Sequence, residues 1–302
     1  MKQVKLNFKE FLFALVKLTR PINSFMIGLA TIIGMQISDS NWFNLKFLTN
    51  LGYVSGVTVT ILAFFAAFLA SSFSMVFNDY IDYKVDIINS PHKPIPAGKI
   101  SREAALLYAI LLALVSSLLS FIISYISFFI VISGLLISFL YNTYLKKKGL
   151  IGNIMVAYST SLPFIYGASI LYFSNFIPIL ILIMLALLSN ISREIIKGIA
   201  DIEGDKALGI LTVANVHGKK FAVRLASFFI ILAIISSIIP FIFKLLNLYY
   251  LIPILITDSI FIYATYILVK SQMESTALKS KNLYLVAMLI TLIGFFIISY
   301  YE

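Results

Sequence analysis

Residues 51–86 read LGYVSGVTVTILAFFAAFLASSFSMVF followed by NDYIDYKVD. The first part, residues 51–77, contains no Asp, Glu, Lys or Arg. It is long enough for a transmembrane helix, which needs roughly 20 apolar residues to cross a bilayer. The second part then introduces Asp79, Asp82 and Asp86 within about two helical turns. This order predicts a membrane-spanning helix that ends in an acidic cluster at one membrane surface.

Similar apolar stretches recur along the whole chain. The 302 residues are 61% hydrophobic and 12% charged, whereas about a quarter of the residues in a soluble domain are charged. With a mean hydropathy of +1.00, the chain has too little polar surface to coat a soluble globule. We therefore predict an all-α, multi-pass membrane bundle of about nine helices, forming a single domain over residues 1–302. The helices are expected near residues 10–36, 51–77, 101–123, 125–145, 152–172, 175–198, 218–243, 248–270 and 281–300.

The basic residues predict how the chain is oriented in the membrane. If the N-terminus lies in the cytoplasm, all 23 Lys and Arg residues except Lys46 and Lys244 fall on the cytoplasmic side. This is the bias of the positive-inside rule, and it explains the net charge of +10 without nucleic acid as a partner. We expect a cell-membrane protein with a cytoplasmic N-terminus and a cytoplasmic site. Because Cys is absent, thiolate metal sites and cysteine nucleophiles are excluded.

Acidic residues gather at the ends of two predicted helices, although the chain has only 13 of them. Those concerned are Asp79, Asp82, Asp86, Glu194, Asp201, Glu203 and Asp205. Asn78, Asp82 and Asp86 lie at i, i+4 and i+8 and therefore share one helical face, which Asp79 borders. Asp201 and Asp205 repeat the i, i+4 spacing if the helix continues through Gly204. The clusters are four predicted helices apart and should emerge on the same membrane side, as in two parallel four-helix units plus a ninth helix.

Such a placement of carboxylates is unfavourable unless a cation offsets it. Acidic side chains at i, i+4 repel one another, and negative charge is also disfavoured at the C-terminal end of a helix. Hard oxygen ligands select Mg²⁺ or Ca²⁺, and Mg²⁺ commonly binds one or two carboxylates together with substrate phosphates. The alternative is a solvated polar cap in which the carboxylates pair with nearby Lys and Arg. Two clusters on one face of so acid-poor a chain favour metal-bridged phosphate binding.

Basic side chains stand where a bound diphosphate would need them. The candidates on the expected cytoplasmic side are Arg20, Lys93, Arg102, Lys146, Arg193 and Lys197. Each of them also satisfies the positive-inside rule, so topology alone would account for its presence. The chemistry of the acidic clusters is what makes them candidates for phosphate binding.

At these residues the chain resembles the UbiA-type intramembrane prenyltransferase family. Residues 78–86 (NDYIDYKVD), 91–98 (PHKPIPAG) and 201–205 (DIEGD) carry the resemblance. Residues 20–23 (RPIN) and 141–146 (YNTYLK) support it, and it extends over nearly the whole chain. It implies a nine-helix bundle that opens laterally to lipid and binds a polyprenyl diphosphate.

In such enzymes, Mg²⁺ held by the two Asp motifs grips the diphosphate. The implied metal and diphosphate ligands are Asn78, Asp79, Asp82, Asp86, Asp201 and Asp205, with Asp79 the least certain to point at metal. Arg20 and Asn23 belong to the matching RPIN segment. As the allylic C–O bond breaks, the cation and basic side chains would stabilise the leaving diphosphate. Aromatic faces such as that of Tyr141 could stabilise the allylic cation.

The acceptor is inferred from resemblance alone. Residues 193–205 and 91–101 look most like the archaeal branch, whose members attach a second geranylgeranyl chain to geranylgeranylglyceryl phosphate during ether-lipid synthesis. The alternative is an aromatic acceptor such as 4-hydroxybenzoate. The expected partners are therefore a polyprenyl diphosphate, a lipid-like acceptor and membrane lipids.

A transporter that uses carboxylates from two half-repeats is a competing hypothesis from another class. Transporter sites usually lie near the bilayer midplane, whereas both acidic clusters are expected at one edge. Asp258 is the one acid expected deep in a helix, and we interpret it as hydrogen-bonded to a neighbouring helix or as lying near an outer water pocket. The sequence therefore favours an enzyme.

Overall fold

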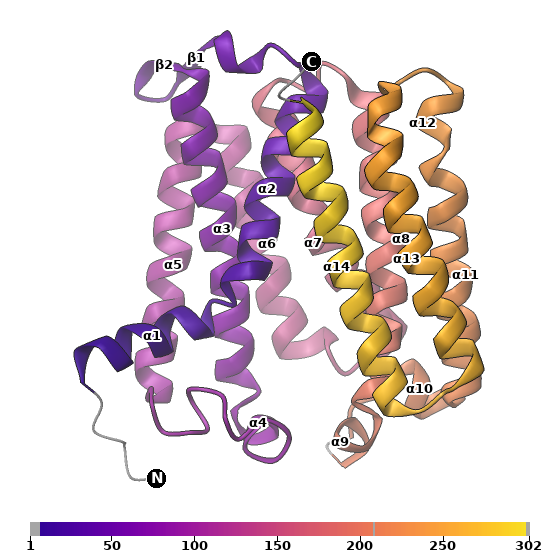
Figure 1. Ribbon diagram of the computed structural model, residues 1–302. Helices are drawn as coiled ribbons and strands as arrows, with labels where there is room; N and C mark the ends of the chain where they lie inside the picture. The colour runs from indigo at the N-terminus through magenta and orange to yellow at the C-terminus, as the bar shows by residue number, and fades with distance from the viewer. Residues whose placement is uncertain (1–6, 208, 300–302) are drawn as a thin grey trace. The chain divides into compact units, whose positions relative to one another are not determined.

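A computed structural model describes residues 7–207 and 209–299 and shows a helical protein with one short hairpin. The chain divides into two compact units, residues 1–31 with 43–143, and residues 32–42 with 144–302. Figure 1 shows the elements by label. The all-α fold class is confirmed, while the single domain stays a prediction.

The first unit is built around the long helix α3. Its elements are α1 (Phe8–Leu18), the first part of α2 (Pro21–Ser38), β1 (Lys46–Thr49), β2 (Gly52–Ser55), α3 (Gly56–Ile81), α4 (Tyr83–Asn89), α5 (Arg102–Ile123), α6 (Tyr125–Leu140) and most of a π-helical turn (Tyr141–Leu145). α5 packs along α3, and α6 packs against both of them. The C-terminal end of α3 therefore lies next to the N-terminal end of α5.

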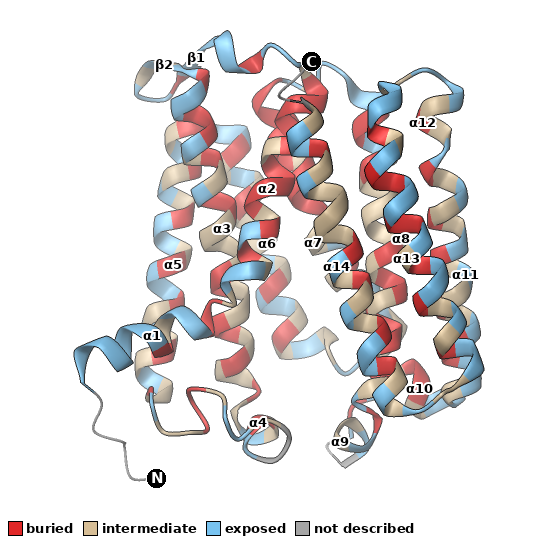
Figure 2. Cartoon of the chain, viewed as in Figure 1, coloured by how far each residue is buried: buried red, intermediate tan, exposed pale blue. Residues whose placement is uncertain are grey.

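Small side chains let α5 approach its neighbours closely. Ala105, Ala109 and Ser116 follow a helical spacing and are fully buried. The opposite face carries exposed leucines, such as Leu107 and Leu114. Figure 2 shows this alternation of buried and exposed turns along the helix. An apolar face of this kind is suited to lipid.

The first predicted helix, over residues 10–36, is wrong in one respect because the structure has two helices there. α1 ends at Leu18 and α2 begins at Pro21, with Arg20 at φ 46° between them. A residue that precedes proline is disfavoured in the α region, which accounts for the break. The break sends α1 off in another direction, with Phe8 and Phe13 largely exposed (Figure 1). An apolar face on a short helix at the start of a membrane protein is suited to the membrane interface.

The helix predicted over residues 51–77 also begins later than expected, at Gly56. Residues 46–55 form the antiparallel hairpin β1–β2 instead, with Lys46 opposite Ser55. Its turn is tied to the end of α5, where the Asn50 backbone N–H donates to the Ile122 carbonyl oxygen at 3.1 Å. At the other end, α3 continues to Ile81, beyond the predicted residue 77.

The second unit is centred on α8. Its elements are the end of α2, α7 (Leu150–Ile170), α8 (Phe176–Ala200), α9 (Ile202–Ala207), α10 (Val213–His217), α11 (Lys219–Ser237), α12 (Ile239–Ile242), a 3-10 turn (Leu248–Tyr250), α13 (Leu251–Lys270) and α14 (Glu274–Ser299). α8 packs against α7, α11 and α14, and α13 packs against α14 and α11. Ile195, Ile196 and Tyr284 are fully buried in the resulting core. This packing fixes the C-terminal half of α8, which carries the second acidic cluster.

Eight of the described helices are long and apolar enough to cross a membrane. α7 has 21 residues and lies where the fifth helix was predicted, but it is not one of the eight. It contains Ser, Thr, Asn and Pro side chains among its apolar residues. The helix breaks expected near Ser124 and Asn175 are confirmed, because each of these residues begins a new helix as its N-cap. The chain is thus a multi-pass membrane protein.

A close approach within the second unit gives a first testable prediction. A Cβ added at Gly34 would lie 2.5 Å from the Phe164 carbonyl oxygen, and backbone cannot easily move away. At Gly198 an added Cβ would meet only the Thr212 side chain, at 3.2 Å. We expect Gly34→Ala to lower the free energy of unfolding by about 1–3 kcal/mol, as overpacking does, and Gly198→Ala to cost less. Thermal unfolding in detergent would measure both, and equal losses would contradict the close approach.

Candidate active site

The first Asp motif, residues 78–86, sits where α3 passes into α4. Asp82 ends α3 with φ −78° and ψ 4°, which bends the chain without interrupting the helical hydrogen bonds. Backbone N–H groups of Asp82 and Asp86 donate to the carbonyl oxygens of Asn78 and Asp82, both at 2.8 Å. The i, i+4 spacing of the three residues is therefore confirmed. Asp79, Asp82 and Asp86 are all buried, at 3%, 8% and 5% exposure.

Lys93 bridges two of these carboxylates. Its Nζ lies 3.0 Å from Asp79 Oδ1 and 2.9 and 2.7 Å from the two oxygens of Asp86. Arg20 Nη2 approaches Asp79 Oδ1 from the other side, at 2.7 Å. Asp79 thus accepts hydrogen bonds from two cationic side chains, one in the α1–α2 break and one in the loop after α4. The structure brings four predicted site residues together here: Arg20, Asp79, Asp86 and Lys93.

The loop that carries Lys93 is held in a fixed shape by turns and by buried apolar side chains. The Lys93 N–H donates to the Ser90 carbonyl, and the Ala97 N–H donates to the Lys93 carbonyl. Ile95 and Ile100 are buried in the core of the first unit. The PHKPIPAG segment therefore positions the ammonium group of Lys93 against the acidic motif.

The electrostatic balance at Asp86 still favours additional positive charge. Burial raises the pKa of Asp86 above its ordinary value of 3.8, although Lys93 opposes the shift by its hydrogen bond and its charge. The neighbouring carboxylates of Asp79 and Asp82 also raise the pKa. One ammonium group therefore does not fully compensate for the desolvation of this carboxylate. A further cation near Asp86 would stabilise its ionised form.

Asn78 is oriented by a residue that the sequence did not point to. Its Nδ2 donates to Asn142 Oδ1 at 2.6 Å, and Asn142 in turn donates to the Ser138 carbonyl at 2.9 Å. Asn142 and Tyr141 lie in the π-helical turn after α6, a form often found at functional sites. The YNTYLK match contained this signal, since it covers Asn142. With its amide nitrogen used in this way, Asn78 presents its carbonyl oxygen as the atom that could face a cation.

Three other predicted residues, Arg102, Asn23 and Lys146, belong to α5, to α2 and to the segment after the π-helical turn. Arg102 stacks over the rings of Tyr80 and Tyr83, at 4.8 and 5.2 Å from their centroids, and pairs with no described carboxylate. Asn23 lies half-buried in the first turn of α2, and Lys146 lies half-buried directly after the π-helical turn. The prediction that Arg102 faces a diphosphate therefore has no support from its contacts.

The second acidic cluster lies at the end of α8. The Asp205 N–H donates to the Asp201 carbonyl oxygen at 2.9 Å, so the helical spacing does continue through Gly204. Asp201 is half-exposed, and Lys281 Nζ of α14 lies 3.8 Å from its Oδ1. We call residues 201–205 the second Asp motif. Lys281 was not predicted, because only the packing of α14 on α8 brings it here.

Glu194 organises the basic residues about two turns further into α8. It is buried, and its two oxygens pair with Arg193 Nη1 and Lys197 Nζ, each at 3.2 Å. The structure therefore gives these predicted diphosphate ligands a protein carboxylate as a partner. The Nε of Arg193 is buried and has no hydrogen-bond partner within the described part of the chain. That donor leaves Arg193 with capacity to bind an anion.

The donor set can be compared with the needs of a divalent cation. Within residues 7–207 and 209–299, no group of three His, Asp or Glu side chains is placed to hold a metal ion. The motifs instead offer hard oxygen ligands on successive helical turns. This fits Mg²⁺, which keeps few protein ligands and completes its shell with water and substrate phosphates. A cation held by protein ligands alone would not fit.

Comparisons with known proteins identify the class. Residues 27–299 match the UbiA prenyltransferase family. The chain therefore belongs to this family, and it is a membrane-bound prenyltransferase.

Individual relatives match this chain over most of their own length. The digeranylgeranylglyceryl phosphate synthase of Methanocaldococcus jannaschii is 33% identical over 290 residues, which cover 96% of this chain and 97% of the relative. That of Thermococcus sibiricus is 33% identical over 262 residues, covering 87% and 88%. A solved structure of a digeranylgeranylglyceryl phosphate synthase covers 97% of this chain and 100% of its own, with 32% identity and a TM-score of 0.73.

A UbiA homologue from Archaeoglobus fulgidus, solved with GPP and Mg²⁺, shares the fold. It is 18% identical and has a TM-score of 0.63, and the match covers 92% of this chain and 99% of that one. At this level of identity, the comparison supports the helical arrangement of the family and nothing about individual side chains.

Proposed function

We propose that this chain transfers a geranylgeranyl group from geranylgeranyl diphosphate to the glycerol hydroxyl of geranylgeranylglyceryl phosphate. The allylic C–O bond of the donor breaks, an ether C–O bond forms at the acceptor hydroxyl, and diphosphate is released. The similarity to digeranylgeranylglyceryl phosphate synthases over nearly the whole chain supports this acceptor. The observation that carries the proposal is the buried carboxylate cluster at the end of a membrane helix, bridged by Lys93.

In this proposal, each Asp motif holds Mg²⁺ through its oxygen atoms, and the bound Mg²⁺ grips the diphosphate. The residues concerned are Asn78, Asp82, Asp86, Asp201 and Asp205. Bound Mg²⁺ would neutralise charge on the leaving diphosphate. Asp79 plays a different part, because Arg20 and Lys93 already pair with it. It anchors these two cationic side chains beside the motif.

The basic side chains supply the remaining positive charge. Arg20 keeps 38% of its side chain exposed while it holds Asp79, so its guanidinium can also donate a hydrogen bond to a phosphate oxygen. In the second unit, the buried Nε of Arg193 offers a donor of the same kind. These donors are fixed before substrate binds, and fixed dipoles and charges are what stabilise a developing anion.

Tyr141 is proposed to face the allylic cation. Its place in the π-helical turn, next to Asn142 and its bond to Asn78, puts it beside the first Asp motif. The face of an aromatic ring attracts a cation without acting as a nucleophile. The apolar helices would exclude the water that otherwise captures such a cation.

The expected orientation follows from charge. Arg20, Lys93 and the first Asp motif belong to segments that the positive-inside rule assigns to the cytoplasm. The proposal therefore places the N-terminus and the site on the cytoplasmic side of the cell membrane.

The function can be tested with purified protein in detergent. We expect geranylgeranyl diphosphate to be consumed only when both Mg²⁺ and geranylgeranylglyceryl phosphate are present, with release of diphosphate. Chelation with EDTA should stop the reaction, and added Mg²⁺ should restore it. Preferential prenylation of 4-hydroxybenzoate in a direct competition would contradict the proposed acceptor. Mg²⁺-independent turnover would contradict the proposed role of the carboxylates.

A further inference from the structure

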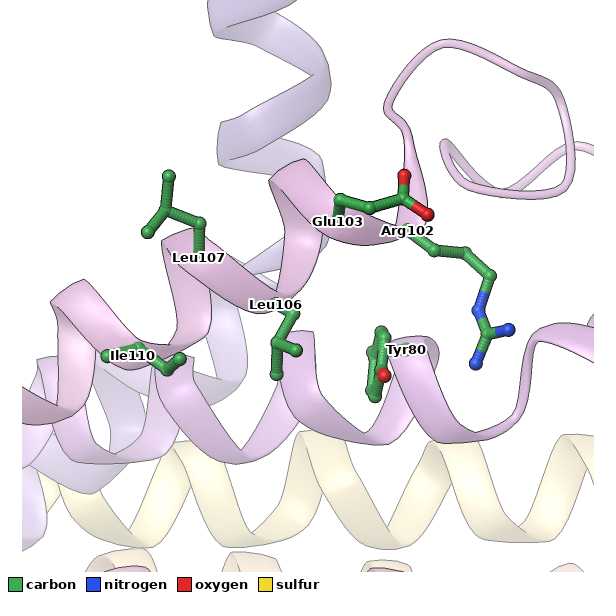
Figure 3. A pocket seen from close by; sticks show the side chains of 6 residues that line it. All are labelled: Tyr80, Arg102, Glu103, Leu106, Leu107 and Ile110. Carbon is green, nitrogen blue, oxygen red and sulfur yellow. The ribbon is translucent and has the colours of Figure 1, made fainter.

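A pocket on the first unit lies away from the carboxylate cluster, between the end of α3 and the start of α5. Its volume is about 280 Å³, and it is lined by Tyr80, Arg102, Glu103, Leu106, Leu107 and Ile110. Figure 3 shows the guanidinium of Arg102 beside the Tyr80 ring, with the apolar side chains further along α5. On a helix, Tyr80 points away from the face shared by Asn78, Asp82 and Asp86. The pocket is therefore separate from the ion-pair cluster.

Arg102 is held in the pocket by aromatic rings and not by a carboxylate. It lies over Tyr80 and Tyr83, at 4.8 and 5.2 Å from their ring centroids. Its Nε is buried, and no described residue accepts a hydrogen bond from it. Stacking on a ring uses the face of a guanidinium and leaves its N–H groups directed outward in the plane. Arg102 is thus fixed in position as a donor for an oxyanion.

The level of the pocket relative to the membrane indicates which kind of oxyanion Arg102 would bind. Arg102 is the first residue of a 22-residue apolar helix that is long enough to cross the membrane. Its side chain therefore lies at the level of the lipid headgroups, where basic and aromatic side chains meet phosphate. Leu107 and Ile110 continue from it into the span, at 69% and 46% exposure. A ligand with a phosphate at one end and a hydrocarbon chain at the other matches this arrangement, in which a basic side chain is followed by apolar ones.

Glu103 places a second requirement on the headgroup of the ligand. Its side chain lines the same pocket and is exposed, and hydrogen bonds from its own backbone N–H and from Ser101, together with the charge of Arg102, stabilise its carboxylate. A ligand that carries only negative charge would be repelled by it. A headgroup that joins a phosphate to a hydrogen-bond donor, such as an ammonium or hydroxyl group, would satisfy both side chains.

We propose that this pocket binds a single membrane phospholipid, with its phosphate on Arg102 and a headgroup donor on Glu103. One hydrocarbon chain of this lipid lies along Leu106, Leu107 and Ile110. The lipid would cover the outer side of Tyr80, whose neighbour Asp79 holds Arg20 and Lys93. It would thereby support the end of α3 from the side opposite the acidic motif.

Native mass spectrometry of the whole protein can test the site. The protein would be exchanged into mixed micelles that contain equal amounts of phosphatidylethanolamine and phosphatidylcholine, which share a phosphate but differ in headgroup donors. We expect one lipid to stay bound at low activation energy, with phosphatidylethanolamine retained at least threefold more than phosphatidylcholine. Arg102→Gln should reduce retention of both lipids. Glu103→Gln should keep total retention but bring the two lipids close to parity.

A matched control is available in the same surface region. Lys99 is exposed and basic, lies three residues before Arg102, and does not line the pocket. Lys99→Gln should leave retention of both lipids unchanged. Equal losses in Lys99→Gln and Arg102→Gln would show attraction by general charge and would overturn the proposal. Retention that is unaffected by Arg102→Gln would overturn it as well, as would an Arg102→Gln variant that loses only geranylgeranylglyceryl phosphate binding.

Discussion

Asp82→Asn should abolish prenyl transfer while leaving the folded protein intact. Asp82 is buried at the junction of α3 and α4, and its backbone holds the helical bonds that align Asn78 with Asp86. Asn preserves the size of the side chain and those backbone bonds, but it removes the negative charge by which Asp82 would attract Mg²⁺. Losing several kcal/mol of metal-assisted stabilisation corresponds to a rate loss of about 10³-fold or more. Diphosphate release and Mg²⁺ binding by calorimetry would measure the two effects.

The same substitution in the second Asp motif, Asp201→Asn, should also abolish turnover. Asp258→Asn is the matched control, because Asp258 is a buried acid of α13 that accepts a hydrogen bond from Ser237 of α11 at 2.8 Å. Asn can keep that bond, so activity should survive. The contact also confirms the interpretation of Asp258 as a side chain bonded to a neighbouring helix. Full activity in both Asp82→Asn and Asp201→Asn would refute the metal-site proposal.

Helical spacing predicted much of the first Asp motif. Asn78, Asp82 and Asp86 are placed by backbone bonds between i and i+4, which depend on local sequence alone. The same local rule holds from Asp201 to Asp205. Membrane helices were predictable for a similar reason, since an apolar stretch of sufficient length has few other stable arrangements in lipid.

Tertiary partners were less accessible to sequence reasoning. The contact of Lys93 with Asp79 and Asp86 depends on the turns of the proline-containing loop, which no periodicity describes. Lys281 reaches Asp201 only because α14 packs on α8. The pairing in such contacts depends on loop and packing geometry and not on helical spacing.

Arg102 illustrates how little charge alone says about the partner of a basic residue. Its position one helix after the first Asp motif made it a candidate for diphosphate binding. The structure instead places it over Tyr80 and Tyr83, because α5 packs along α3. A basic residue near a membrane surface has several possible partners, and only the helix face it occupies selects one of them.

In the absence of metal, Lys93→Met should produce the largest loss of stability among single substitutions in the first unit. Lys93 is the cation that bridges Asp79 and Asp86, which have side chains only 4% and 7% exposed. Removing one member of a buried ion pair costs about 3 kcal/mol, because the remaining carboxylate stays desolvated. In EDTA, the Tm in detergent should fall by roughly 5–10 °C. Asp79 would still be held by Arg20, so most of the loss should arise at Asp86.

The pH dependence of the stability loss in Lys93→Met tests whether the Asp86 carboxylate causes it. Burial already raises the pKa of Asp86 above 3.8, and Lys93 is the group that opposes the rise, so the substitution should raise it further. An acid whose pKa is higher in the folded state binds protons more tightly there, and stability falls as pH rises toward that pKa. The deficit of Lys93→Met should therefore be small near pH 4 and complete at neutral pH. A deficit that does not change with pH would point to lost packing of the lysine stem.

The effect of Mg²⁺ on Tm tests whether the ion can take the place of the Lys93 ammonium group. If Lys93 supplies positive charge at a place that suits a divalent cation, Mg²⁺ should raise the Tm of Lys93→Met more than that of the unsubstituted protein. Lys84→Met is the matched control, since Lys84 is exposed in α4 and lies between Asp82 and Asp86 in sequence. Its stability should change little in EDTA or in Mg²⁺. Equal Mg²⁺ responses in all three proteins would mean that Mg²⁺ does not replace the positive charge of Lys93 at these carboxylates.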